Sequence, residues 1–230
     1  MGLDVDAARA DCGAGLRRRP DQNRCPQTHF GRDDALAVLP MRCLWEDAGM
    51  AVEVVAYSKD WPAQFDRVAE GLRQALSAVS VDSIEHVGST SIAGLAAKPI
   101  LDVDIIVRAG DVAAAVAALE HVGYRHCGDL GVTGREAFTA PDDEPRRHVY
   151  VCTAGSLSVR NHLAVRDILR RRDDLRDEYA RVKFNLASDP TIDIDTYLAR
   201  KSAVLQKVLG ESDLSDDERR QILQLNQPMN

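Results

Sequence analysis

The stretch from Ser83 to Val107 reads SIEHVGSTSIAGLAAKPILDVDIIV, and it decides the fold expected for the chain. An apolar segment is followed by small residues from Gly88 onward and then by a second apolar segment. This pattern predicts a strand, a turn with a short helix, and a second strand. The second strand carries Asp102 and Asp104 in an otherwise apolar run, and the functional interpretation rests on those two residues.

Strand alternation places Asp102 and Asp104 on one face, with their Cα atoms about 6.6 Å apart. The opposite face is then fully apolar, formed by Leu101, Val103, Ile105 and Val107. Two carboxylates in an apolar strand repel each other, so one takes up a proton unless a cation lies between them. Mg²⁺ prefers one or two carboxylates completed by water and substrate phosphates. The pair is therefore a candidate magnesium site, and a charged edge strand is the alternative.

The residues Gly88, Ser89 and Thr90 follow the first of these strands directly. Their backbone amides and two hydroxyls can approach phosphate oxygens without a bulky side chain in between. A plain turn is the alternative for this pair of small residues. The segment is not a P-loop, because no Gly-x-x-x-x-Gly-Lys-Ser/Thr pattern occurs, and it is not a dinucleotide fingerprint. Together with the aspartates, it predicts a phosphate cradle beside a metal.

Composition limits the class of protein. The chain has 230 residues, is 45% hydrophobic and carries a net charge of −7, which argues against coating nucleic acid by bulk electrostatics. Its five cysteines form no Cys-x-x-Cys pair, so we expect reduced thiols in a cytoplasmic protein. No apolar run reaches the roughly 20 residues of a membrane span. Aromatic residues make up only 5%, so a nucleic-acid partner is not expected.

Three regions are expected along the chain. Residues 1–49 are polar and interrupted by Pro and Gly, which indicates a poorly ordered extension. Residues 50–210 are expected to form the main domain, and residues 211–230 a helical tail.

Periodicity predicts the elements of the main domain. Strands are expected at 52–57 and 148–152, and helices at 60–79, 111–122, 159–172, 175–187, 194–209 and 216–225. Asp60 is a plausible cap for the first helix. The glycine-rich segment from Gly128 to Phe138 is expected to be a loop. Between Ser158 and Lys183 the chain has eight basic and five acidic residues, a local reversal of its sign that indicates either a solvated face or phosphate contact.

Residues 86–102, HVGSTSIAGLAAKPILD, resemble the GrpB family, a predicted nucleotidyltransferase family. The segments GVTGREAF at 131–138, HVYV at 148–151 and NHLAVRD at 161–167 share this likeness. The Gly-Ser pair followed by Asp-Val-Asp also resembles the signature of the polymerase-beta-type nucleotidyltransferase superfamily. The likeness covers about residues 52–209.

The resemblance implies an α/β (α+β) fold with a central mixed sheet flanked by helices and a helical C-terminal part. It implies that Asp102 and Asp104 bind Mg²⁺ and act in catalysis, and that Gly88 and Ser89 contact nucleotide phosphates. Further candidates for nucleotide binding in the family-like segments are Thr90, Lys98, Arg135, His148, Asn161, His162 and Arg166. In the superfamily a third carboxylate lies on a later strand, but the corresponding segment here, HVYV, has no acid. Three alternatives follow. Glu136 or Glu85 takes the place of the third carboxylate, His148 acts as base or ligand, or the site binds a nucleotide without transferring it.

Two functions follow. The first is a Mg²⁺-dependent nucleotidyltransferase that transfers a nucleotidyl group from a nucleoside triphosphate to an unidentified small-molecule acceptor. The second is a non-catalytic nucleotide- or metabolite-binding module on the same fold, suggested by the missing third acid. The sequence does not determine the oligomeric state.

Overall fold

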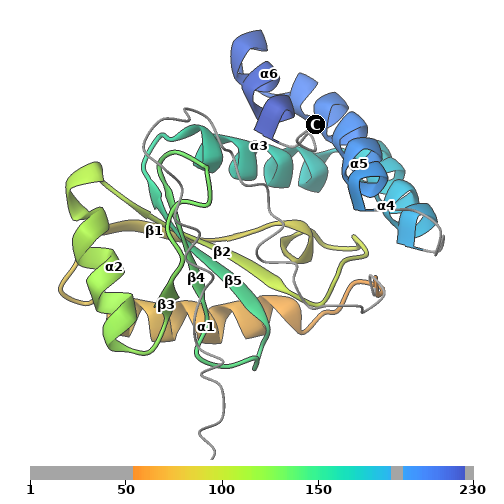
Figure 1. The fold of residues 1–230 in the computed structure, drawn as a ribbon. Helices are drawn as coiled ribbons and strands as arrows, with labels where there is room; N and C mark the ends of the chain where they lie inside the picture. The colour runs from red at the N-terminus through yellow and green to blue at the C-terminus, as the bar shows by residue number, and fades with distance from the viewer. Residues whose placement is uncertain (1–53, 188–193, 226–230) are drawn as a thin grey trace, which may run out of the picture. The chain divides into compact units, whose positions relative to one another are not determined.

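A computed structural model of the chain describes residues 54–187 and 194–225. These residues form a mixed sheet with helices on both faces (Figure 1). The strands are β1 (Val81–Val87), β2 (Leu101–Val107), β3 (Arg125–His126), β4 (Arg135–Thr139) and β5 (Arg147–Thr153). The predicted α/β class with a central mixed sheet is confirmed. The predicted extension at 1–49 lies outside the described residues, and the domain boundaries stay predictions.

The helices account for most of the remaining described residues, and they confirm the predicted helical C-terminal part. They are α1 (Trp61–Ala75), η2 (Ser89–Ser91), η3 (Ala109–Asp111), α2 (Val112–His121), α3 (Leu157–Arg171), α4 (Asp173–Ala187), α5 (Ile194–Gly210) and α6 (Asp216–Leu225). Within the described ranges, none of these helices has both the length and the apolar character needed to cross a membrane.

The strand order is β1-β2-β5-β4-β3, so β2 lies inside the sheet. It pairs with β1 in antiparallel and with β5 in parallel orientation, and β4 pairs with β5 in antiparallel orientation. The two aspartates of β2 are therefore flanked by residues of β1 and β5. This pairing on both sides excludes the alternative of a charged edge strand.

One face of the sheet is a hydrophobic core beneath α1 and α2. All four apolar residues of β2 that alternate with the aspartates, Leu101, Val103, Ile105 and Val107, are buried there against side chains such as Leu72 and Leu119. Burial of a side chain of this size contributes about 1.5–3 kcal/mol. The predicted two-faced character of β2 is confirmed, and the core holds the backbone that carries the aspartates.

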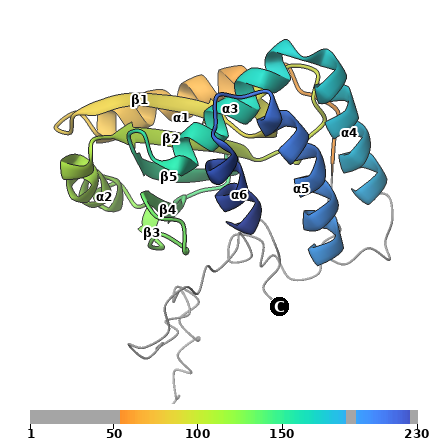
Figure 2. The same ribbon diagram turned by 90° about the horizontal axis from the view of Figure 1, so that it is seen from above.

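The other face of the sheet is covered by α3, and α4 and α5 pack beside it (Figures 1 and 2). Val159 of α3 packs on Tyr150 and Cys152 of β5. Further along α3, Ile168 and Leu169 join α4, α5 and the connection before β2 through a separate cluster that includes Ile92. The same helix therefore links the aspartate face of the sheet to the C-terminal helices.

Three predicted elements differ from the structure. Of the strand expected at 52–57, the described part forms only one bridge, with Val55 pairing with Ala97 outside the sheet. The helix expected to reach residue 79 ends at Ala75, because the chain turns there and the Val79 amide donates to the Leu76 carbonyl oxygen. The loop expected over 128–138 becomes β4 from Arg135 onward, since that segment pairs with β5.

Candidate active site on the aspartate face of the sheet

The two aspartates of β2 differ in exposure. Asp104 is completely buried, whereas the side chain of Asp102 keeps 31% of its surface exposed. In the described structure, Asp104 Oδ1 is buried without a hydrogen-bond partner. A buried carboxylate oxygen in that state costs free energy unless a donor or a cation satisfies it. Asp104 is thus the inner member of the pair, and Asp102 is the member that a ligand can reach.

Each aspartate contacts one histidine. His148 of β5 lies beside Asp102 in the parallel register, with 3.1 Å between its Nδ1 and Asp102 Oδ1. His162 of α3 approaches from above the sheet, with 2.7 Å between its Nδ1 and Asp104 Oδ2. Burial lowers the pKa of His162, but the charge of Asp104 and the hydrogen bond to it outweigh this, so the pKa lies above its ordinary value. The two imidazoles leave one oxygen of each carboxylate without a histidine contact.

Gly88 closes the turn against Asp102. Its backbone has φ 68° and ψ −172°, a region that is accessible essentially to glycine alone. A Cβ atom built on Gly88 would lie 2.0 Å from Asp102 Oδ2. The Ser91 hydroxyl donates to the Gly88 carbonyl oxygen at 2.7 Å and holds the turn. The glycine therefore allows the turn and the carboxylate to occupy adjoining space.

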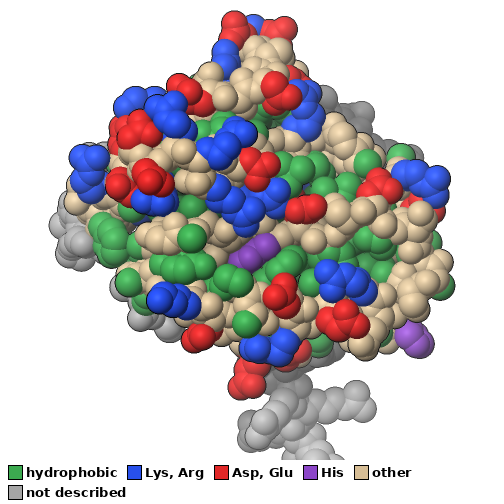
Figure 3. Space-filling view, turned by 180° about the vertical axis from the view of Figure 1, so that it is seen from behind, with side chains coloured by type: hydrophobic (Ala, Val, Ile, Leu, Met, Phe, Trp, Pro, Cys, Tyr) green, Lys and Arg blue, Asp and Glu red, His purple; other side chains and the backbone are tan. Residues whose placement is uncertain are grey.

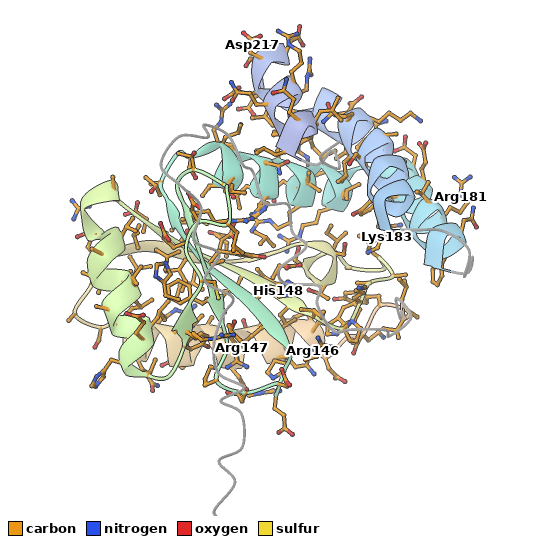
Figure 4. The ribbon with its side chains drawn as sticks, in the orientation of Figure 1. Arg146, Arg147, His148, Arg181, Lys183 and Asp217 are labelled. Carbon is orange, nitrogen blue, oxygen red and sulfur yellow. The ribbon has the colours of Figure 1, made fainter. Side chains whose placement is uncertain are left out.

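The two hydroxyls after Gly88 have different surroundings. Ser89 Oγ accepts a hydrogen bond at 2.9 Å from Nζ of Lys183. Figure 4 labels Lys183 on α4. Thr90 is buried, and its hydroxyl donates to the Ile100 carbonyl oxygen at 3.2 Å while lying 3.1 Å from His86 Nε2. The Thr90 proton is thus used inside the turn, whereas Ser89 is only half-buried.

His86 supports the turn from the opposite face of the sheet. Its ring stacks on Phe65 of α1, with 4.7 Å between the ring centroids. Burial lowers the pKa of His86 to about 4, so the ring is neutral near pH 7. Because Thr90 donates its proton to a carbonyl, the neutral ring donates to Thr90 Oγ1 through Nε2.

Arg135 of β4 is buried on the same face of the sheet as the aspartates, since it pairs with Cys152 of β5, two residues from the Tyr150 that pairs with Asp104. Its guanidinium carbon is 4.6 Å from the ring centroid of Tyr150, and the residue is only 5% exposed. Burial raises the pKa of the Tyr150 hydroxyl, so this side chain stays neutral. Arg135 Nε has no hydrogen-bond partner in the described structure. Its burial and its charge give Arg135 an electrostatic role toward Tyr150 and His162.

The register identifies which glutamate shares the aspartate face. Glu85 of β1 pairs directly with Asp104, so both side chains lie on the same face. Arg166 of α3 contacts Glu85 Oε2 at 2.7 Å. Glu136 pairs with Val151, which belongs to the core under α1 and α2, and its Oε2 lies 2.6 Å from His126 Nε2. Of the two predicted substitutes for a third acid, only Glu85 lies with the aspartates.

The carboxylates fit a magnesium ion as a partial ligand set. Within the part of the chain that the structure describes, no group of three or more His, Cys, Asp or Glu side chains is arranged to hold a metal by itself. Mg²⁺ nevertheless needs only one or two carboxylates when substrate phosphates and water complete its octahedron. The unpartnered Asp104 Oδ1 and the partly exposed Asp102 supply such oxygens.

Comparison with known proteins identifies the family. A sequence profile described as GrpB protein matches residues 51–211. The chain belongs to the GrpB family. A UPF0157 protein of Halalkalibacterium halodurans is 34% identical over 161 residues, which cover 69% of this chain and 81% of that protein. A UPF0157 protein of Pseudomonas aeruginosa is 34% identical over 166 residues, covering 70% of this chain and 67% of that protein.

A solved structure supports the same assignment. The crystal structure of the conserved protein GrpB from Enterococcus faecalis has a TM-score of 0.60 and 30% sequence identity to this chain. The match covers 69% of this chain and 98% of the other. The fold and the family are therefore established together.

The structure brings most of the predicted site residues of this GrpB chain to one face of β2. Asp102, Asp104, His148 and His162 are in mutual contact as two pairs, with Gly88 against Asp102. Two further candidates flank these residues in the chain: Lys98 is half-buried before β2, and Asn161 is half-buried beside His162 on α3. Their roles in nucleotide binding stay predictions.

Lys183 is the residue that sequence reasoning missed at this site. It follows Leu175 and Tyr179 at steps of four residues on α4, and all three are buried. A lysine at a position of the apolar stripe of a helix was the available signal. The predicted basic excess of this region included Lys183 but did not distinguish it from the exposed arginines around it.

Proposed function

We propose that this GrpB-family protein is a Mg²⁺-dependent nucleotidyltransferase that acts on a nucleoside triphosphate and a small-molecule acceptor. One observation carries the proposal: Asp102 and Asp104 share a face of an interior strand, and Gly88 closes against Asp102 Oδ2. The two carboxylates would bind Mg²⁺, and the glycine lets a phosphate chain approach them. When bound, the metal neutralises charge on the phosphates and orients them.

The remaining residues have defined tasks in this proposal. The Ser89 hydroxyl donates to a phosphate oxygen, and His148 and His162 fix the orientation of the two carboxylates. An acceptor hydroxyl or phosphate attacks the α-phosphorus, the bond to the bridging oxygen breaks, and pyrophosphate leaves with the electron pair. Glu85 and His148 are the candidates for removing a proton from an acceptor hydroxyl, since both lie on the aspartate face.

Surface charge supports a small-molecule acceptor over a nucleic acid. On the face shown in Figure 3, acidic and basic side chains are interspersed, and a large uniformly basic surface is not seen there. Nucleic-acid binding depends on many phosphate contacts from Lys and Arg. The mixed charge and the net charge of −7 therefore favour a compact ligand. A cytoplasmic location stays a proposal that rests on the five cysteines, which form no Cys-x-x-Cys pair.

A non-catalytic module that binds a nucleotide or metabolite is the second candidate function. It is favoured by one observation, that the β5 residues beside Asp102 and Asp104 are His148 and Tyr150 and neither is acidic. The two functions share the ligand site and differ in turnover.

The test compares binding and turnover in matched variants. Thermal unfolding is measured with each nucleoside triphosphate, with and without Mg²⁺, because a ligand at 100 times its Kd stabilises the folded state by about 2.7 kcal/mol. Pyrophosphate release is then followed with candidate acceptors. Asp102→Asn and Asp104→Asn should abolish Mg²⁺-dependent turnover, whereas Asp82→Asn, an exposed aspartate of β1, should not. Unchanged turnover in both site variants would refute the proposal, and binding without any product would support the second candidate.

A further inference from the structure

Lys183 is buried although α4 lies at the surface of the fold. Only 4% of the residue is exposed. Its Nζ atom donates to Ser89 Oγ at 2.9 Å and to the Ala96 carbonyl oxygen at 2.9 Å. Burial of an ammonium group is costly unless hydrogen bonds compensate it. This lysine is therefore specifically directed at the segment that connects β1 to β2.

The contact determines how the Ser89 hydroxyl can act. A lysine ammonium group has three donors and no acceptor, so Ser89 Oγ must be the acceptor in this hydrogen bond. The Ser89 proton is then available to donate in another direction. The Tyr179 hydroxyl also interacts with Ser89, and Lys183 Nζ lies 5.3 Å from the centre of the Tyr179 ring. Two side chains of α4, Lys183 and Tyr179, thus hydrogen-bond to the Ser89 hydroxyl, and Lys183 is a donor in its bond.

Resting on the proposed function, we propose that Lys183 is a positioning residue for phosphate binding and acts through Ser89. It fixes the Ser89 hydroxyl as a donor to an oxygen of the polyphosphate chain and places a positive charge behind that hydroxyl. The ligand class is a nucleoside triphosphate or another polyphosphate, whose charge is offset in two ways. Mg²⁺ held by Asp102 and Asp104 would offset part of that charge, and the Ser89–Lys183 pair would supply a hydrogen-bond donor and a further positive charge.

The purely structural alternative makes a different prediction. If Lys183 only fastens α4 to the connection through the Ala96 carbonyl, its loss lowers stability and leaves the affinity of the folded protein unchanged. If Lys183 acts through Ser89, its removal and the removal of the Ser89 hydroxyl weaken the same ligand contact. A double-mutant cycle separates the two, because groups in one hydrogen-bond network have non-additive effects.

The experiment uses the full chain and inorganic tripolyphosphate with Mg²⁺ as the probe. Affinity is measured by titration calorimetry at a temperature where every variant is folded. The variants are Ser89→Ala, Lys183→Met, the double variant, and Lys183→Gln in case the apolar replacement does not fold. Lys207→Met is the control, since Lys207 also contacts α4, through Glu178 at 2.7 Å, but is exposed.

We expect each single site variant to weaken tripolyphosphate binding by about 10-fold or more, as for loss of a hydrogen bond to a charged group. The affinity of the double variant should be at most about 3-fold below that of the single variant that binds less tightly. Lys207→Met should bind tripolyphosphate like the wild type. The inference would be overturned if the loss of affinity in the double variant were the product of the two single losses. It would also be overturned if both Lys183 variants kept the wild-type affinity, or if the wild type did not bind tripolyphosphate. No turnover is needed for this test, so absent nucleotidyl transfer with intact coupling would refute the proposed function alone.

Discussion

Gly88→Ala tests the geometry on which the proposed site depends. The φ of 68° and ψ of −172° cost an alanine about 1–3 kcal/mol in backbone strain. The new methyl group would also lie 2.0 Å from Oδ2, 2.8 Å from Cγ and 2.9 Å from Cβ of Asp102. Because the Cβ atom is involved, rotation of the Asp102 side chain does not relieve the overlap completely, and the turn or the strand must shift.

The substitution also has a functional cost. Contacts of a methyl carbon are normally about 3.5–4.0 Å, so the added methyl group and Asp102 Oδ2, which would lie 2.0 Å apart, must separate by more than about 1 Å. A displacement of that size at a reacting centre costs about 100-fold in rate. We therefore expect Gly88→Ala to lose at least about 100-fold in Mg²⁺-dependent turnover, and to lose the stabilisation by nucleoside triphosphates, while remaining folded.

Gly128→Ala is the matched control. Gly128 also has a positive φ, of 76°, but a Cβ atom there would meet nothing within 4 Å. It should cost about 1–2 kcal/mol in stability and leave ligand binding intact. Urea unfolding gives the stability of each variant, and thermal shift with nucleotide and Mg²⁺ reports the site. If the ligand raised the unfolding temperature of Gly88→Ala as much as that of Gly128→Ala, the contact between the turn and Asp102 would not matter for binding. That result would refute the reasoning.

Three further predictions concern single side chains. Burial lowers the pKa of His86 to about 4, below that of the ring in the unfolded chain, so the contribution of neutral His86 to stability is complete above pH 6.5 and is lost as the pH falls toward 4. Urea unfolding should show that the wild type loses up to about 3 kcal/mol more stability than His86→Gln between these pH values. If the stabilities of the two proteins changed in parallel with pH, the prediction would be contradicted. Asp104→Asn should lower the pKa of His162 by removing the charge that raises it, which NMR titration of the ring will test, and an unchanged value would show that the pair does not form. Leu72→Ala should lower the free energy of unfolding by about 2–5 kcal/mol, because Leu72 is buried in the core under α1. Val122→Ala, at an exposed position, should lower it by about 0.5 kcal/mol or less. Equal unfolding midpoints for the two variants would place Leu72 outside the core.

Local pattern was enough to predict the two-faced strand. The alternation of Asp102 and Asp104 with buried apolar residues has period two, and burial of that apolar face leaves the backbone only one orientation. The glycine-rich segment before β4 shows the limit of the same reasoning. Its glycines indicated a loop, but Arg135 to Phe138 gain backbone hydrogen bonds from β5, and pairing with a distant strand overrides local preference.

The partners of the aspartates depend on register and docking. Glu85 and Glu136 were equal candidates in the sequence, and only strand pairing places one beside Asp104 and the other on the opposite face. The contact of Lys183 with Ser89 spans 94 residues and requires α4 to dock on the turn. Interactions that depend on such tertiary packing leave only a weak signal in one sequence, here a lysine in an apolar stripe.

The charges on the aspartate face connect the integrity of the fold to that of the site. Asp104 and Glu85 are directly opposite each other on neighbouring strands, an arrangement that is destabilising for like charges. Two side chains contact these carboxylates from α3, one helical turn apart: His162 contacts Asp104, and the Arg166 cation contacts Glu85. The aspartate face is therefore electrostatically complete only when α3 is docked, and displacement of α3 would leave two carboxylates in conflict. A magnesium ion brought by a polyphosphate would act on the same conflict, which gives ligand binding and α3 docking a common electrostatic basis.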